Sequence, residues 1–346
     1  MARWKIIMRT NFFIRLKRWE YWPFGIVQFP AILYWIWLSL RARSFVFFTA
    51  SNPGIPMGGM FGESKYEILK KIPSRLVPRT ILIHPDLSAN AVKHCLEAAG
   101  LTLPLIFKPD IGERGYRVMR IDNDNDITEY LLTTRTAFLA QELVTEKLEF
   151  GVFYMRMPHE EHGRVISVVG KEMLFVEGNG RSTLQELINK TDRAKLQWKR
   201  LKVSFRDKLT WIVPAGRRVE LVSIGNHALG TRFIDMNHLI NERLSEAFDK
   251  ISINIPGFYF GRYDLRCASL EDLYNGNVRI MELNGCGAEP VHIYDTEFSL
   301  WKAMTVLIKH WEYIFLIATT NQRNGVSYMS HREAFGYYKK FKSAVN

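Results

Sequence analysis

Residues 279–290 read RIMELNGCGAEP, and this stretch ends an apolar run with two polar side chains, Glu282 and Asn284. Side chains alternate across a β-strand, so Glu282 and Asn284 are predicted to share one face. The small residues that follow expose backbone N–H groups and let a substrate approach closely. Gly285 and Gly287 are therefore candidate substrate-binding positions.

A second strand-like stretch, GRYDLR at residues 261–266, places Arg262 and Asp264 on one face by the same rule. Asn275-Gly276, between the two stretches, is a strong turn signal and predicts that they pair. All four polar side chains would then point into one cleft. Two carboxylates and an amide oxygen suit Mg²⁺ held jointly with phosphate oxygens, and the guanidinium suits a phosphoryl group. Taken singly, the same residues could form a solvated strand end or a salt bridge.

A glycine-containing stretch lies far upstream of these strands. IFKPDIGERGYRV, residues 106–118, places Lys108 at a strand end, followed by a turn with Gly112 and Gly115. A glycine loop can fold over a polyphosphate and donate backbone N–H groups to it. The spacing matches neither a Walker P-loop nor a dinucleotide-binding fingerprint, and a plain hairpin would also explain it.

The chain has 346 residues, enough for one large domain or two modest ones, and its net charge is +12. The charge is uneven, because residues 1–48 hold eight Lys/Arg and one acid and so supply +7. Cations placed beside many aromatic residues favour an anionic membrane surface over a nucleic-acid groove as the partner. Three cysteines without metal-like spacing indicate a reducing, cytoplasmic compartment, with neither disulfides nor a zinc site expected.

Residues 21–40 run for twenty positions without a charge. Three interpretations stay open: a segment on or in the surface of a bilayer, an ordinary buried element, and a membrane span. Pro23, Gly25, Gln28 and Pro30 disfavour a straight spanning helix, and cations on both flanks leave its orientation undetermined.

Past residue 50, strand-like and helix-like stretches alternate in an α+β pattern with much antiparallel sheet. Helices are predicted over 64–72, 88–100, 181–190, 235–251 and 297–317. Strands are predicted over 79–85, 103–109, 137–144, 149–157, 164–175, 257–267 and 277–284, with a glycine-interrupted hairpin over 110–121. The last helix carries an apolar stripe that is most often core: residues 300, 301, 304, 307, 308, 311 and 314.

In this order, the motifs resemble the ATP-grasp superfamily and, within it, carboxylate–amine ligases such as D-alanine–D-alanine ligases and cyanophycin synthetases. The resemblance covers roughly residues 63–300 and implies two α+β subdomains gripping ATP between antiparallel sheets. VEGNGRSTLQELI (176–188) and VPAGRRVELVSIGNHALGTRFID (213–235) look like the corresponding stretches of the cyanophycin synthetase type. The implied organisation is an N-terminal segment over 1–62, subdomains over 63–139 and 140–320, and a C-terminal tail over 321–346.

The resemblance also implies site residues. The two ATP lysines look like Lys65 and Lys108, with Gly112 and Gly115 in the loop between the lysine-bearing strand and the next. The hinge under the adenine is similar to Gln141, Glu142, Leu143 and Val144, and the ribose-binding acid to Glu149. Asp264, Glu282 and Asn284 correspond to the metal set, Arg262 to the phosphate-binding arginine, and Asn226 to a position on the substrate side.

The implied activity is ATP-dependent joining of a carboxylate to an amine through an acyl phosphate, with Mg²⁺ (or Mn²⁺) as the metal. A lipid-linked or membrane-proximal substrate, at the cytoplasmic face of a membrane, is expected from the N-terminal segment. A phosphotransferase with a hydroxyl acceptor and a non-catalytic ATP-binding scaffold are the alternatives. The chain departs from the ligases before Lys65, where Gly58, Gly59 and Glu63 only loosely resemble a substrate loop and a turn is the simpler account.

Overall fold

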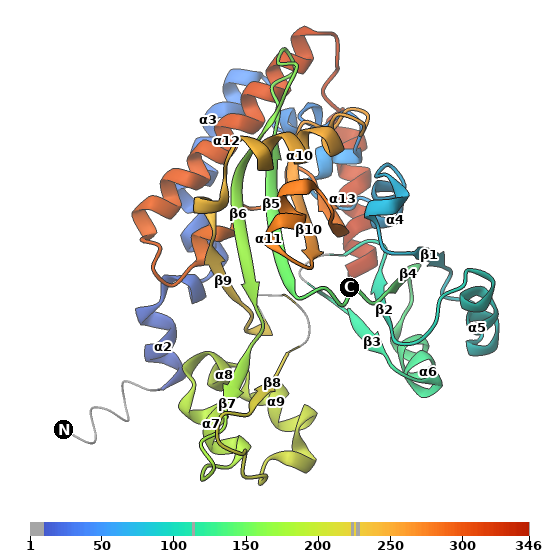
Figure 1. Ribbon diagram of the computed structural model, residues 1–346. Coiled ribbons are helices and arrows are strands. Elements are labelled where there is room, and N and C mark those ends of the chain that lie inside the picture. Colours follow the sequence, from blue (N-terminus) through green and yellow to red (C-terminus); the bar gives the residue numbers. More distant parts are fainter. Residues whose placement is uncertain (1–9, 113–114, 223–224, 226–228, 346) are drawn as a thin grey trace.

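The structure is a computed structural model that describes residues 10–112, 115–222, 225 and 229–345. It confirms the α+β class (Figure 1). A four-stranded sheet has the order β1-β4-β2-β3, a five-stranded sheet the order β11-β10-β5-β6-β9, and β7 and β8 form a small third sheet. Every pairing within these sheets is antiparallel, as the sequence predicts for most of them.

The four-stranded sheet holds the N-terminal side of the candidate site. Its strands are β1 (Thr80–Ile83), β2 (Leu105–Pro109), β3 (Met119–Ile121) and β4 (Phe138–Glu142). One face is covered by α5 (Ala89–Ala98) and by α6 (Asp124–Thr133), through a core that includes Val92, Phe107 and Tyr130. Helix α6 was not among the predicted elements, although Asn123 and Asp126 form a full capping box at its start.

The five-stranded sheet is the largest element. Its strands are β5 (Leu148–Met155), β6 (Arg164–Glu172), β9 (Arg232–Asp235), β10 (Phe260–Cys267) and β11 (Arg279–Asn284). One face packs on α10 (Glu242–Ser252) and α11 (Leu270–Asn275), with Tyr154, Phe248 and Tyr263 fully buried between them. The same core reaches the four-stranded sheet through α4 (Lys65–Leu69), so the two sheets share an interior.

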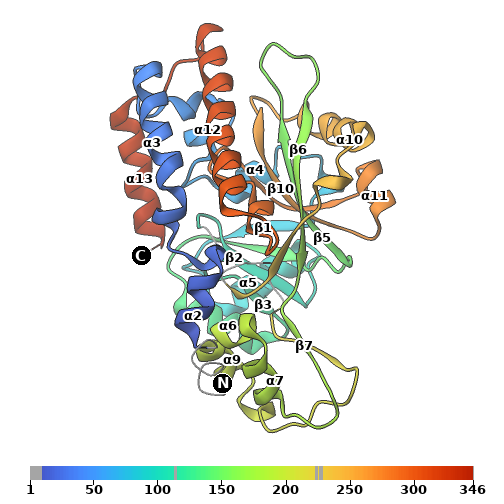
Figure 2. The ribbon, with the colours of Figure 1, turned by 90° about the vertical axis from the view of Figure 1, so that its left-hand side faces the viewer.

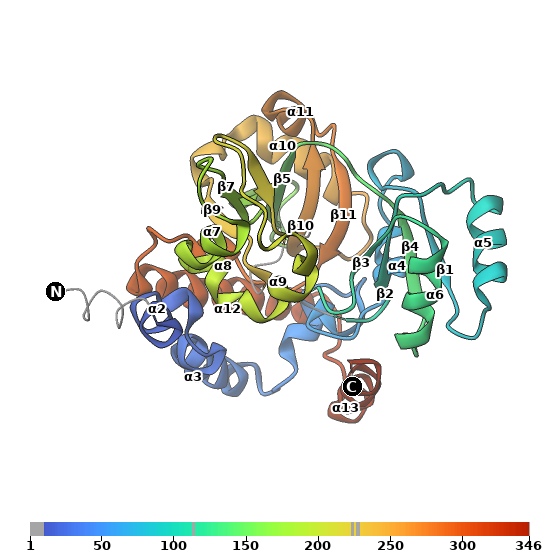
Figure 3. The same cartoon turned by 90° about the horizontal axis from the view of Figure 1, so that it is seen from below.

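The opposite face of the five-stranded sheet is covered by helices from both ends of the chain. α3 (Phe24–Ala42) and α12 (Leu300–Arg323) lie side by side there, while α10 and α11 lie on the far side of the sheet (Figures 2 and 3). Phe47 from η2 (Phe47–Ala50), Phe153 and Ile314 meet in this core. α3 follows α2 (Asn11–Lys17) and η1 (Trp19–Tyr21) and stays continuous through Pro30.

The remaining elements complete the chain. A small lobe contains β7 (Phe175–Glu177), β8 (Arg218–Glu220), α7 (Leu184–Lys190), α8 (Asp192–Leu196) and α9 (Trp198–Ser204). α13 (His331–Val345) closes the chain, and its Phe341 ring lies 5.7 Å from that of Phe61. The short 3-10 helices are η3 (Pro56–Gly59), η4 (Ser74–Leu76), η5 (Arg206–Lys208), η7 (Asn237–Leu239) and η8 (Val291–Tyr294).

Two local predictions are wrong, and a third, the apolar stripe of the last long helix, is confirmed at Leu307 and Ile314 but not at Trp301. Asn275-Gly276 does not make a hairpin turn, because α11 stands between β10 and β11 and Gly276 is its left-handed C-cap. The helix predicted from residue 235 begins at Glu242, where Asn241 accepts a hydrogen bond from the Leu244 N–H. The buried face of α12 follows Ala303, Leu307, His310 and Ile314, and Trp301 of the predicted stripe is 79% exposed.

Candidate active site

The paired strands β10 and β11 bring together the four polar residues that were predicted to share one cleft. Asp264 lies opposite Glu282, and Arg262 lies opposite Asn284, so all four side chains are on one face. The Asn284 amide donates to Asp264 Oδ2 over 3.1 Å, and Arg262 Nη2 is 3.0 Å from the same oxygen. The expected face-sharing is therefore present, although a helix rather than a tight turn connects the strands.

Two lysines from the other sheet and its neighbouring helix point into the same cluster. Lys108 Nζ, from β2, donates to the Gln141 side chain over 2.9 Å and to the backbone oxygen of Met281 over 3.0 Å. Lys65 Nζ, from α4, is 3.7 Å from Glu282 Oε1. The cluster thus lies at the junction of the two sheets.

Local capping explains where Lys65 lies. Ser64 caps α4 by accepting from the Glu67 N–H, and its hydroxyl donates to Asp110 Oδ1 over 2.9 Å. Asp110 also accepts from the Tyr66 N–H, and it directly follows the end of β2. The start of α4 and the end of β2 are therefore fastened together, and each carries one of the two lysines.

The charges of the cluster are strongly coupled. Burial lowers the pKa of Lys108 to about 8, although Glu282 pulls in the opposite direction. Burial would raise the pKa of Asp264, but attraction to Arg262 and Lys171 outweighs it and holds that pKa below its usual range. At neutral pH the cluster therefore keeps an ionised carboxylate beside several cations.

Sequence reasoning missed Lys171. Its ammonium, from β6, lies 2.9 Å from Asp264 Oδ1 and 3.3 Å from Glu149 Oε1, and its side chain is buried. Burial disfavours its charge, but the two carboxylates outweigh burial and raise its pKa. β6 reads RVISVVGKE, and its period-2 alternation puts Lys171 on the same face as Val169, but nothing in that pattern indicates a buried ion pair.

The residues expected around adenine and ribose lie on β4 and β5. Gln141 is buried and orients Lys108 while donating to Thr80 Oγ1 over 2.9 Å. Glu142 instead faces outward and pairs with Arg279 over 2.6 Å. The next two hinge positions, Leu143 and Val144, follow β4, and Val144 is 7% exposed.

Both carboxylate oxygens of Glu149 contact cations in this structure. Its Oε2 accepts from Arg266 Nε over 2.9 Å, and its other oxygen faces Lys171. Arg266 also donates to the backbone oxygen of Val144 over 3.2 Å, so it ties the hinge to β10. A ribose hydroxyl would reach Glu149 only by sharing it with these cations.

The structure gives the glycines after Asn284 a packing role. The N–H of Cys286 donates to the backbone oxygen of Gly58 over 3.0 Å, and the N–H of Gly287 donates to that of Gly59 over 2.9 Å. A Cβ at Gly285 would lie 2.5 Å from the Gly58 oxygen. The Gly58-Gly59 turn is therefore part of the wall beside the cluster, and two amides expected to meet substrate are hydrogen-bonded to it.

Other predicted positions are described only in part. Gly112 accepts a hydrogen bond from Lys65 through its backbone oxygen, and Gly115 has a left-handed φ of +69°. Residues 113 and 114 between them, and the candidate substrate residue Asn226, lie outside the described residues.

The oxygen donors fit a hard divalent cation. Asp264, Glu282 and Asn284 are adjacent across two paired strands, and their side-chain oxygens are of the kind that Mg²⁺ prefers, but here the Asn284 NH2 group points to Asp264, so the amide would have to turn to offer its oxygen. Among the described residues, no three His, Cys, Asp or Glu side chains are placed to share a metal. A metal bound by Asp264 and Glu282 would therefore also need the amide oxygen of Asn284 and oxygens of a bound ligand.

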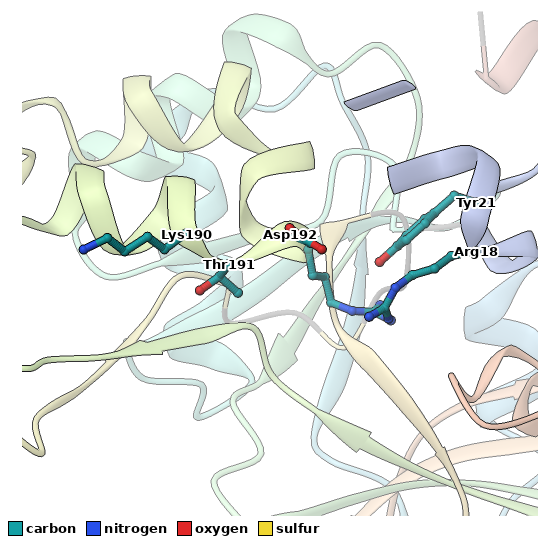
Figure 4. A pocket seen from close by; sticks show the side chains of 6 residues that line it. Arg18, Tyr21, Lys190, Thr191 and Asp192 are labelled. Carbon is teal, nitrogen blue, oxygen red and sulfur yellow. The ribbon is translucent and has the colours of Figure 1, made fainter. Parts of the chain in front are cut away.

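An open pocket of about 470 Å³ lies elsewhere. It is formed between η1 and the α7–α8 connection, and Figure 4 shows Arg18 and Tyr21 on one side, with Lys190, Thr191 and Asp192 on the other. Glu20 next to it pairs with Arg193 over 2.8 Å. None of the residues lining this pocket belongs to the cluster.

Comparisons with known proteins give structural likenesses only. No protein-family model matches the chain, and no curated protein matches it. Among solved structures it is similar to a bifunctional glutathione synthetase from Pasteurella multocida, with 15% identity, a TM-score of 0.37, and coverage of 71% of this chain and 35% of that one. It is also similar to a D-Ala:D-Ser ligase from Enterococcus faecalis, with 14% identity, a TM-score of 0.39, and coverage of 72% and 61%.

A D-alanine–D-alanine ligase from Bacillus anthracis is similar at 13% identity with a TM-score of 0.41, over 76% of this chain and 69% of that one. The chain thus spans about a third of the synthetase and about three fifths of the D-Ala:D-Ser ligase. At these identities and TM-scores the activity has to be argued from the site itself.

Proposed function

We propose that the protein is an ATP-dependent ligase that joins a carboxylate to an amine. The observation that carries this proposal is the meeting of Lys65 and Lys108 with Arg262, Asp264 and Glu282 at the junction of two antiparallel sheets. Cations and oxygen ligands in one cluster match a polyphosphate bound together with a divalent metal. The motif resemblance to ATP-grasp ligases supports the same chemistry.

Each residue of the cluster would have its own role in binding ATP, the metal or the transferring phosphoryl group. Lys65 and Lys108 would hold phosphate oxygens, and Asp264, Glu282 and Asn284 would hold Mg²⁺, which neutralises phosphate charge when bound. Arg262 would stabilise charge on the transferring phosphoryl group with its guanidinium fork. Arg262 Nη1 also donates to the backbone oxygen of Glu289 over 2.8 Å, which fixes its direction.

The reaction needs no protein nucleophile. The substrate carboxylate attacks the terminal phosphorus of ATP and releases ADP, and the amine then attacks the acyl carbon and releases phosphate. The amine loses one proton as the amide forms. The protein contributes positioning and charge stabilisation, which supply most of the rate in phosphoryl transfer.

We also propose a membrane-proximal substrate at the cytoplasmic face. α3 supports this, because its Gln28 side chain donates to the Glu289 carboxylate next to the backbone oxygen that Arg262 binds. A helix with several exposed large apolar side chains is therefore connected to the loop that orients Arg262.

Trapping with hydroxylamine tests the proposal. The full-length protein is incubated with Mg-ATP, hydroxylamine and the small-molecule fraction of a cell extract, and hydroxamates, ADP and phosphate are measured. Hydroxamate formed together with ADP and phosphate is the expected result. ADP with a stable phosphoester would indicate a phosphotransferase, and ATP binding without ADP would indicate a scaffold.

The variant Glu282→Gln tests the metal-binding role of Glu282 in the same assay. The Glu282 side chain is 30% exposed and lies 3.7 Å from Lys65, so the change should lower turnover by about 100-fold or more with little change in Tm. Glu271→Gln is the control, because Glu271 is an exposed acid on α11 paired with Arg243. Equal turnover in wild type and Glu282→Gln would remove Glu282 from the metal set.

A further inference from the structure

One face of α3 is exposed and wholly apolar. Seven large side chains along it are 39–65% exposed: Ile26, Phe29, Ile32, Leu33, Ile36, Trp37 and Leu40. No charged residue occurs from Phe24 to Leu40. We call these seven side chains the outer face of α3. A continuous apolar surface of this extent is unusual on a protein that meets only water.

The opposite face of α3 is held by the fold. Val27 and Ala31 pack with Leu307, and Leu38 packs with Ile314. α3 is the one described helix that is long and apolar enough to cross a bilayer, yet its partner α12 carries charged residues and covers the five-stranded sheet. Crossing a bilayer would pull these contacts apart, so the geometry favours a helix lying in the plane of a surface.

Cations stand at both ends of the outer face. Arg15 and Lys17 of α2 and Arg18 are exposed before it, and Arg41 and Arg43 are exposed after it. The one acid between residues 10 and 48 is Glu20, which is buried and paired with Arg193. Phe12 and Leu16 of α2 add two more exposed apolar side chains, 68% and 53% exposed, between the cations.

We propose that the outer face of α3, flanked by these cations, docks the protein in the plane of an anionic lipid bilayer. Apolar side chains enter the acyl boundary and arginine and lysine meet lipid phosphates, as in interfacial amphipathic helices. A second copy of this chain is a less favourable partner for the outer face of α3. Two outer faces would bring the cations at their ends close together, and these like charges repel.

The docking places the active site close to the membrane surface. Gln28, on the inner side of α3, contacts Glu289, and the Glu289 backbone oxygen is bound by Arg262. The docking itself is independent of the proposed ligase activity, because vesicle binding is measured without ATP.

Vesicle flotation tests the docking surface on the full chain. Wild type should float with vesicles of phosphatidylcholine containing phosphatidylglycerol and bind pure phosphatidylcholine more weakly. A variant with Ile26→Glu, Phe29→Glu, Leu33→Glu and Leu40→Glu should bind both at least about 100-fold more weakly. Arg15→Gln and Lys17→Gln should each weaken binding about fivefold, and only with the anionic vesicles.

The control variant carries Leu132→Glu and Val203→Glu. These side chains are 71% and 66% exposed on α6 and α9, away from α3, so the variant should float like wild type. Wild type left at the bottom of the gradient, or the four-glutamate variant floating normally, would overturn the proposal. So would a wild-type dimer that does not float and that the variant abolishes.

A second measurement does not depend on the glutamate variant folding. A nitroxide is attached to Leu33→Cys in a Cys95→Ser background, because Cys95 is exposed. With anionic vesicles, the label should become more accessible to oxygen and less accessible to a polar nickel complex. An unchanged ratio of the two accessibilities would also overturn the docking.

Discussion

Lys108 shows how a single buried side chain can make ligand binding depend on pH. Its amine meets two neutral oxygens, from Gln141 and Met281, and burial lowers its pKa from 10.5 to about 8. Between these two values the unfolded chain binds more protons than the folded one. The charged buried amine therefore lowers the free energy of unfolding by its full amount below pH 8. This loss of stability disappears as the pH rises toward 10.5.

A bound polyphosphate would restore the proton. At pH 9 we expect Mg-ATP binding to take up close to one proton, because an anion beside Lys108 raises its pKa. Affinity should fall by about tenfold per pH unit above pH 8 in wild type and stay nearly flat in Lys108→Arg, which cannot lose its charge in this range. Calorimetry in two buffers of different ionisation enthalpy measures the uptake. No uptake by wild type at pH 9 would contradict the placement of Lys108 beside the phosphates.

Lys171 is the residue-scale feature that sequence reasoning could not recover. It joins Asp264 and Glu149, which are over a hundred positions apart in the sequence. A lysine at the end of an apolar strand is usually a solvent-exposed gatekeeper, and nothing local distinguishes this one. By contrast, the shared faces of β10 and β11 followed from the two-residue period, so four of the clustered side chains could be predicted.

At the scale of elements, two glycine turns hold the site wall together. Gly58 and Gly59 have left-handed φ values of +65° and +74°, and their backbone oxygens accept from residues 286 and 287. The contact joins the segment before α4 to the loop after β11 without any side chain between them. The turn proposed for residues 58–59 agrees with these φ values. The sequence did not indicate that this turn would pack against residues 286 and 287.

Gly285→Ala tests this contact. The new Cβ would lie 2.5 Å from the Gly58 oxygen and 2.7 Å from the Gly59 Cα, so the free energy of unfolding should fall by about 1–3 kcal/mol. Gly336→Ala in α13 has no atom within 4 Å and should raise it by about 0.5–1 kcal/mol. Urea denaturation measures both. Equal stability of Gly285→Ala and wild type would show that the two turns do not pack this closely.

At the scale of the whole molecule, the N-terminal segment is part of the core. Trp19 donates to the backbone oxygen of Phe298, Leu38 packs with α12, and Phe47 is fully buried. Of the three interpretations of residues 21–40, the buried element is confirmed for the side of the helix that carries Val27, Ala31 and Leu38, and a segment at a bilayer surface stays a prediction. The boundaries expected at residues 62, 139 and 320 remain predictions.

Deleting residues 1–48 should therefore unfold the protein. The deletion removes Val27, Leu38 and Phe47 from two cores, and each of these buried side chains contributes about 1.5–3 kcal/mol, which together approaches the stability of an ordinary domain. We expect an insoluble chain or one without a cooperative thermal transition. The four-glutamate variant of the outer face should melt like wild type. A soluble 49–346 chain with a cooperative transition would contradict this.

The sequence by itself determined what depends on neighbours along the chain: the antiparallel α+β pattern, the helix starts at Ser64 and Ser88, and the common faces of Arg262 with Asp264 and of Glu282 with Asn284. Backbone geometry repeats every two or three to four residues, so local order is enough to reveal these features. Only the tertiary structure decided that Lys171 binds Asp264, that Gly58 meets Cys286, and which side of α3 is buried. Those contacts join residues that are far apart in the sequence, and packing of whole elements selects them.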